Sequence, residues 1–106
     1  MTEVHLEPRH LVMIEQMLQD FILEARVWCF GSRVHGRELK RFSVFDLVVR
    51  DEEDMQAQLG KLRDAFEASN LPIKLDLSEW NQLPDWLKQD ILEEYVVLQE
   101  PAKTAI

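Results

Sequence analysis

Two short apolar segments on either side of a polar, basic stretch constrain the fold of this chain most strongly. Residues 26–30 are rich in β-branched and aromatic side chains and end at Gly31. Residues 44–49 form a second apolar run of the same kind. Runs of this length and composition, bounded by glycine and polar residues, are typical of β-strands. The sequence therefore predicts two neighbouring strands, joined over residues 32–42 by a short helix and a loop.

The rest of the chain predicts helices and further strands around this pair. Apolar side chains recur at helical spacing in three segments, residues 7–24, 51–69 and 83–95. The apolar stripe of the last segment consists of Trp86, Leu87, Ile91 and Tyr95. A third strand is expected at residues 73–77, a turn at Ser78 and an edge strand at residues 96–98. This order predicts an α/β (α+β) domain of two layers, in which helices cover a mixed sheet.

The length of the chain, 106 residues, predicts a single domain over residues 1–106, with a polar, flexible tail at residues 99–106. No apolar run reaches the roughly 20 residues that a membrane-spanning helix needs, and the N-terminus does not resemble a signal peptide. The single cysteine, Cys29, excludes an intramolecular disulfide and lies within an apolar strand. We therefore expect a buried, reduced thiol in a cytoplasmic protein.

The charge balance restricts the class of partner. The formal net charge is -8, from 20 acidic residues against 12 lysines and arginines. Proteins that bind nucleic acids usually carry a basic surface, so we expect no direct nucleic-acid binding. Basic residues do gather locally, at Arg33, Arg37, Lys40 and Arg41. The balance favours a basic protein partner and permits a small phosphate ligand beside this local cluster.

Gly31 and Ser32 form a candidate phosphate-binding turn. A glycine at the end of a strand lets the backbone turn sharply and lets a ligand approach closely. If a helix begins after it, its free amides and the Ser32 hydroxyl can donate hydrogen bonds to phosphate oxygens. Gly-Ser by itself is a common turn. Its position ahead of an acidic strand makes the pattern more specific.

Two carboxylates are candidates for metal binding. Side chains alternate along a strand, so Val44 and Asp46 point to the same face. Acids at both positions could share two magnesium ions, but here Asp46 stands alone. Asp76 would approach Asp46 if the third strand pairs beside the second. The alternatives are a simple ion pair of Asp46 with Arg33 or Arg37, and an Asp76 that is solvated or caps a helix.

These elements resemble the nucleotidyltransferase superfamily, which includes DNA polymerase beta. Its signature is Gly-Ser on a turn, followed by an Asp-x-Asp pair on the next strand. The resemblance is closest to the minimal nucleotidyltransferase (MNT) antitoxins, which are encoded beside a ribonuclease toxin of the HEPN class. Gly31, Ser32, Asp46 and Asp76 match the family pattern, whereas Val44 replaces the first Asp of the pair.

The resemblance implies a function and a role for each of these positions. It implies Mg²⁺-dependent transfer of AMP from ATP to a tyrosine of the toxin, which silences the toxin. Asp46 and Asp76 would hold the metal. Gly31, Ser32 and Arg33 would bind the triphosphate.

Val44 marks a lost metal ligand, so we expect this chain to be a disabled form, natural or engineered, of an active enzyme. An antitoxin that acts by binding alone is the main alternative. Nucleotide transfer to a small molecule is a weaker one, because no second domain is present to bind the acceptor. A structural domain without a ligand is the last alternative.

Overall fold

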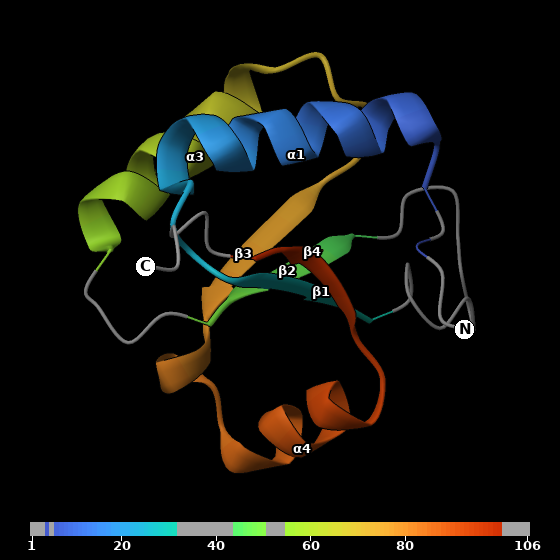
Figure 1. Ribbon diagram of the computed structural model, residues 1–106, viewed down its shortest axis with the longest axis vertical. Helices are drawn as coiled ribbons and strands as arrows, with labels where there is room; N and C mark the ends of the chain where they lie inside the picture. Colours follow the sequence, from blue (N-terminus) through green and yellow to red (C-terminus); the bar gives the residue numbers. More distant parts are fainter. Residues whose placement is uncertain (1–3, 5, 32–43, 51–54, 101–106) are drawn as a thin grey trace, which may run out of the picture.

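The computed structural model describes residues 4, 6–31, 44–50 and 55–100. The helix and loop expected over residues 32–42, and the acids at 51–54, therefore lie outside the described residues. Figure 1 shows the elements in chain order, which are α1 (Pro8–Ile22), β1 (Val27–Phe30), β2 (Phe45–Val49), α3 (Gln56–Ala68), β3 (Leu75–Glu79), the 3₁₀ turn η1 (Trp80–Gln82), α4 (Asp85–Glu93) and β4 (Val96–Gln99). None of the described helices is long and apolar enough to cross a membrane.

The four strands form one mixed sheet in the order β3-β2-β1-β4. β1 runs antiparallel to both β2 and β4, and β2 runs parallel to β3. The α/β fold with a mixed sheet is therefore confirmed, as is the prediction that residues 96–98 lie on an edge strand. The parallel pair is possible because the intervening chain contains α3, which crosses over one face of the sheet.

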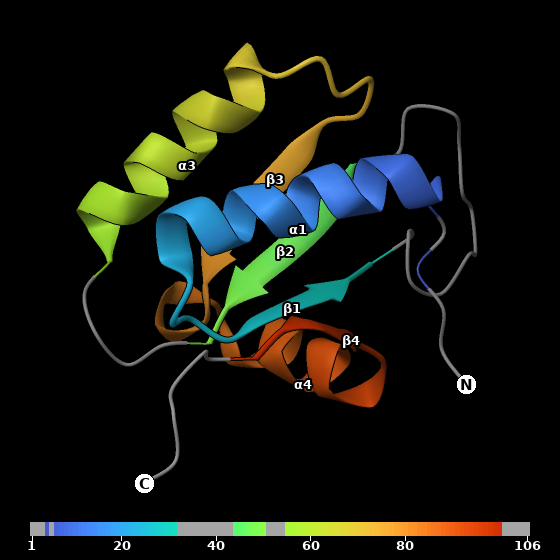
Figure 2. The ribbon, with the colours of Figure 1, turned by 45° about the horizontal axis from the view of Figure 1, so that its top comes forward.

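Helices α1 and α3 lie together on one face of the sheet (Figures 1 and 2). The hydrophobic core lies between them and the sheet, and its buried residues are Ile14, Leu18, Ile22, Ala25, Val27, Cys29, Phe45, Leu47, Val49, Leu59, Leu62 and Leu77. The helical residues of this set recur every three or four positions, and the strand residues alternate, as each type of element requires. This half of the molecule matches the predicted two layers.

Helix α4 covers part of the opposite face of the sheet and adds a third layer (Figure 1). Trp28, Val48 and Ile91 are buried there, with η1 packed beside them. The two-layer prediction did not include this layer. Its physical cause is visible in the strands, since β1 and β2 carry apolar side chains on both faces and both must be covered.

Three local predictions need correction. Ser78 lies in β3 rather than in a turn, because the pairing of β3 with β2 continues to Glu79. Gln99, expected in a flexible tail, ends β4, and its side-chain amide donates to the carbonyls of Ile22 at 2.8 Å and Ala25 at 2.9 Å. Trp86, which the sequence placed in the same apolar stripe as Ile91, is 68% exposed, whereas Ile91 is buried against the sheet.

The prediction for Cys29 is confirmed as far as its burial and its free thiol are concerned. Its Sγ lies 3.6 Å from the carbonyl oxygen of Val96, across the β1–β4 pair. Burial raises the pKa of the Cys29 thiol to about 12. The thiol is thus protonated at neutral pH and part of the core rather than a nucleophile.

Candidate active site

The register between β2 and β3 brings the two predicted carboxylates together. Asp46 and Asp76 are Cα partners across the parallel pair, so the two acids lie side by side on one face. That face is the one covered elsewhere by α4, because the alternate residues Phe45 and Leu47 point into the core beneath α1 and α3. The predicted approach of Asp76 to Asp46 is therefore confirmed.

The two carboxylates open into a cavity of about 340 Å³, lined by Val44, Asp46, Lys74, Leu75 and Asp76. Burial, and to a smaller extent the negative charge of Asp76, together raise the pKa of Asp46 from 3.8 to about 6. A carboxylate that is both half-buried and beside a second carboxylate favours a bound cation, since a cation offsets both effects. Cation binding is the chemistry to which this arrangement is suited.

Gly31, directly after β1, lies close to the Asp46 carboxylate. Its φ angle is +85°, a backbone conformation that residues with a Cβ rarely adopt. A Cβ added at this position would lie 2.5 Å from Oδ2 of Asp46. A glycine is thus required for two separate reasons, and the turn lies directly against the carboxylate. Ser32 and Arg33, the other predicted phosphate-binding residues, lie outside the described residues.

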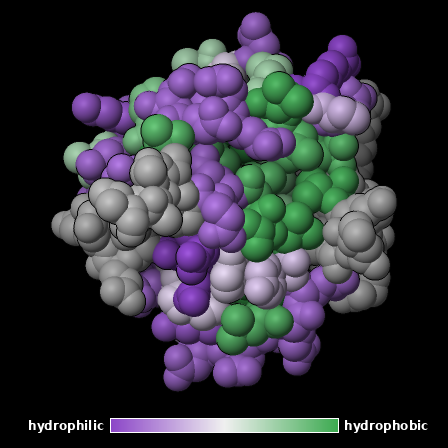
Figure 3. Space-filling model, viewed as in Figure 1, coloured by the Kyte–Doolittle hydropathy of each residue, from purple (hydrophilic) through white to green (hydrophobic). Residues whose placement is uncertain are grey.

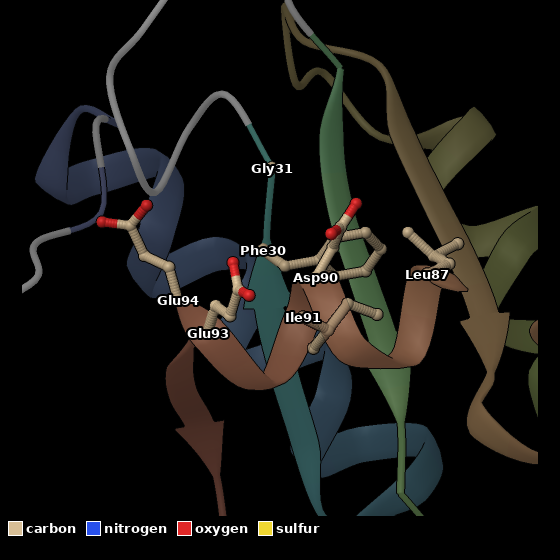
Figure 4. A pocket seen from close by; sticks show the side chains of 7 residues that line it. All are labelled: Phe30, Gly31, Leu87, Asp90, Ile91, Glu93 and Glu94. Atoms are coloured by element: carbon tan, nitrogen blue, oxygen red, sulfur yellow. The ribbon is translucent and has the colours of Figure 1, made fainter. Parts of the chain in front are cut away.

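A larger cavity of about 650 Å³ lies between the end of β1 and α4. Figure 4 shows its lining, in which side chains of α4 rise toward the end of β1, and the lining residues are Phe30, Gly31, Leu87, Asp90, Ile91, Glu93 and Glu94. Gly31 lines this cavity, and a Cβ added to it would meet Asp46, which lines the smaller cavity.

The acids of this larger cavity were not among the predicted site residues. Asp90, Glu93 and Glu94 have i, i+3, i+4 spacing, which places them on one side of a helix. This spacing indicates an acidic side of the helix. It does not show that this side faces a cavity, because that depends on how α4 packs beside the end of β1.

The donor set fits a single magnesium ion better than a pair of ions. Within the described ranges, no group of three or more His, Cys, Asp and Glu side chains is arranged to hold a metal. Magnesium is often bound by one or two carboxylates together with substrate phosphates, and Asp46 and Asp76 meet that requirement. Val44 lines the same cavity without offering a ligand.

Comparison with known proteins decides the family. Residues 12–98 match the model of the nucleotidyltransferase domain. The chain belongs to this family. It is also similar to the probable protein adenylyltransferase MntA of Haemophilus influenzae, with 33% identity over 103 residues, which span 96% of this chain and 90% of that protein.

Solved structures share the nucleotidyltransferase fold. A crystal structure of a toxin-antitoxin with AMP-PNP superposes with a TM-score of 0.66 at 20% identity, covering 92% of this chain and 76% of that one. A structure of the tri-AMPylated Shewanella oneidensis HEPN toxin in complex with MNT antitoxin gives a TM-score of 0.58 at 17% identity, covering 90% and 73%. At these identities the likeness establishes the fold.

Proposed function

We propose that this nucleotidyltransferase is an antitoxin that binds a HEPN-class ribonuclease toxin. We further propose that its site is built to transfer AMP from ATP to a tyrosine of that toxin, and that Val44 weakens or abolishes the transfer. The main support for the proposal is the pairing of Asp46 with Asp76 close to Gly31. The chain is also 33% identical to a probable protein adenylyltransferase. The solved complexes of related fold support the choice of partner.

Each residue of the site has a part in this proposal. Asp46 and Asp76 would hold one magnesium ion, which supplies charge neutralisation for the phosphates when bound. The backbone at Gly31 lets the phosphate chain approach the carboxylates, with Ser32 and Arg33 as further phosphate-binding residues. A cytoplasmic location is part of the proposal, because ATP is the donor and Cys29 is a free thiol.

Val44 determines how much chemistry remains. It lies on the same face as Asp46, where an acid would share a second metal ion with it. Electrostatic stabilisation by a metal ion contributes several kcal/mol to a phosphoryl-transfer transition state, so its loss lowers the rate by about three orders of magnitude or more. Nucleotide binding requires less of the site than transfer does.

An antitoxin that only binds its toxin is the second candidate function, and Val44 is the observation that favours it. The two candidates share the complex and differ in the covalent product. Binding alone leaves the toxin's mass unchanged and needs no ATP, whereas transfer leaves a modified toxin that stays silenced after this chain is removed.

The experiment that tests the antitoxin function uses the proposed partner, a HEPN-class toxin, whose gene we expect beside that of this chain. We expect the two proteins to co-purify and the ribonuclease activity of the toxin to fall as this chain is titrated in. Toxin re-isolated from the mixture by denaturation and refolding distinguishes the candidates, because activity returns if inhibition was by binding alone. Full ribonuclease activity in the presence of excess chain would contradict both.

A further inference from the structure

Lys74 lies where the pairing of β2 and β3 extends beyond Asp46 and Asp76. Phe45 and Leu75 are Cα partners, and the Phe45 amide donates to the Lys74 carbonyl at 2.8 Å, so Lys74 lies beside Val44. Because side chains alternate, Lys74 is on the same face as the two acids. Two adjacent cross-strand pairs therefore share one face, Val44 with Lys74 and Asp46 with Asp76.

Lys74 is the single cation among the described residues that line the 340 Å³ cavity. Its side chain is exposed, and no salt bridge found among the described residues engages it. An acid at position 44 would stand directly opposite Lys74, at the distance where cross-strand charge pairs form. Valine offers no such partner, so the ammonium group is free to meet a ligand in the cavity.

One magnesium ion held by two carboxylates leaves no net positive charge to offset the negative charge of a triphosphate. The ion and the two carboxylates of Asp46 and Asp76 together are neutral, whereas the phosphate chain carries several negative charges. A second metal ion would offset this charge where position 44 is an acid. Lys74 places a positive charge beside that position, and lysine binds phosphates well as a compact point charge.

We propose that Lys74 is a nucleotide-positioning residue whose ammonium group binds the phosphate chain of a nucleoside triphosphate beside Val44. The site of this chain is then made of one metal ion and one lysine, rather than two metal ions. The choice of a nucleoside triphosphate as ligand rests on the proposed function. The role of Lys74 follows from its register and from the missing acid.

The test measures binding of AMP-PNP to the full chain by isothermal titration calorimetry in the presence of Mg²⁺. We expect Lys74→Ala to weaken binding about tenfold or more, the usual effect of losing a hydrogen bond to a charged group. We expect Lys74→Arg to bind AMP-PNP within about threefold of the unchanged chain, since it keeps the charge. The matched control is Lys61→Ala, an exposed lysine on α3, which we expect to leave binding unchanged.

A second pair of variants tests the link between the two positions. In a Val44→Asp background the new acid pairs with Lys74 and shares a second ion, so Lys74→Ala should then weaken binding by less than about threefold. Equal losses in both backgrounds would overturn the link. Loss with Lys74→Ala no greater than with Lys61→Ala, or no binding of AMP-PNP to the unchanged chain, would overturn the proposal itself.

This binding test is independent of the toxin. Lys74-dependent binding of AMP-PNP with no effect of this chain on the HEPN protein would contradict the proposed function and leave the role of Lys74 intact. Inhibition of the toxin without Lys74-dependent nucleotide binding would contradict the role of Lys74 and leave the proposed antitoxin function intact.

Discussion

The two faces of the sheet differ in chemistry and in how completely they are covered. The face beneath α1 and α3 is aliphatic apart from Phe45 and Cys29, and residues such as Leu47 and Leu59 are fully buried against it. The face beneath α4 is aromatic and charged, and it is covered only in part. It carries the two carboxylates at its open end. The face beneath α1 and α3 supplies most of the stability, so the other face can carry carboxylates that lower it.

The covered part of the second face is held by a stack of rings and a cation. Trp28 stacks on Tyr95 with centroids 4.0 Å apart and meets Trp80 edge-on at 5.9 Å. The Arg50 guanidinium lies 4.6 Å from the Trp28 ring and 4.0 Å from the Trp80 ring. Among the described residues, neither Nε1 of Trp28 nor Nε of Arg50 has a hydrogen-bond partner. Polar atoms are therefore buried here at some cost, unlike in the aliphatic core.

A large loss of stability is expected when a side chain is removed from the aliphatic core beneath α1 and α3. Leu47→Ala removes a fully buried side chain and leaves a cavity, so it should lower the free energy of unfolding by about 2–5 kcal/mol. Urea denaturation followed by tryptophan fluorescence measures this change. A loss below about 1 kcal/mol would show that this face does not carry the stability.

A smaller loss is expected at the turn that borders the site. Gly31→Ala forces a Cβ against Asp46 and strains the backbone, at a cost of about 1–3 kcal/mol. Gly60→Ala is the matched control, because a Cβ there meets nothing within 4 Å and Gly60 lies inside α3. We expect that control to stabilise the protein by about 0.5–1 kcal/mol. If both substitutions had the same sign, the contact between Gly31 and Asp46 would not exist as described.

The stability of the protein should depend on pH through the half-buried carboxylate of Asp46. The raised pKa of Asp46, about 6 against an ordinary 3.8, means that the folded state binds this proton more tightly than the unfolded state. The free energy of unfolding therefore falls as the pH rises from about 4 to about 6, and it stays lower above that range.

Asp46→Asn removes this loss. It should stabilise the protein above about pH 6, by on the order of 1 kcal/mol after allowance for solvent screening, and have little effect below about pH 4. Thermal unfolding across this pH range, with a chelator present, measures the difference. Stabilisation that is equal at both ends of the range would contradict the assignment to ionisation.

The smallest effect is expected at Trp86, on the outer side of α4. Because this side chain is 68% exposed, Trp86→Ala should change the free energy of unfolding by less than about 0.5 kcal/mol. The same substitution at Trp28, which is 7% exposed, should cost about 3–5 kcal/mol. Similar losses at the two tryptophans would mean that α4 packs in a different orientation.

Much of the fold follows from sequence periodicity. Strand alternation placed Asp46 and Asp76 on the face opposite the aliphatic core, and helical spacing identified the buried sides of α1 and α3. The end of α3 at Ser69 is also confirmed, where the Ser69 amide and hydroxyl both donate to the Phe66 carbonyl. These features depend on neighbours within a few residues, which is the range that sequence patterns describe.

The rest depends on contacts between distant segments. The sequence left open which strands pair, and the pairing of β2 with β3 is what gives Lys74 its place beside Val44. The larger cavity depends on α4 crossing beneath β1. Gln99 was misplaced because its hydrogen bonds reach back to residues 22 and 25, far away in the chain. Of the predicted site, Ser32 and Arg33 lie outside the described residues, and the metal-binding and phosphate-binding roles of all five residues stay predictions.

We propose that the lack of an acid at position 44 is what separates this chain from an active protein adenylyltransferase. The measurement is the intact mass of the proposed HEPN-class toxin after incubation with ATP, Mg²⁺ and either this chain or its Val44→Asp variant. Val44→Asn serves as the control that matches aspartate in size without its charge. Mass gains in AMP-sized steps with Val44→Asp, and much slower or no gains with the unchanged chain and Val44→Asn, are the predicted result. No gain with any of the three, in a mixture where the complex forms, would contradict the claim.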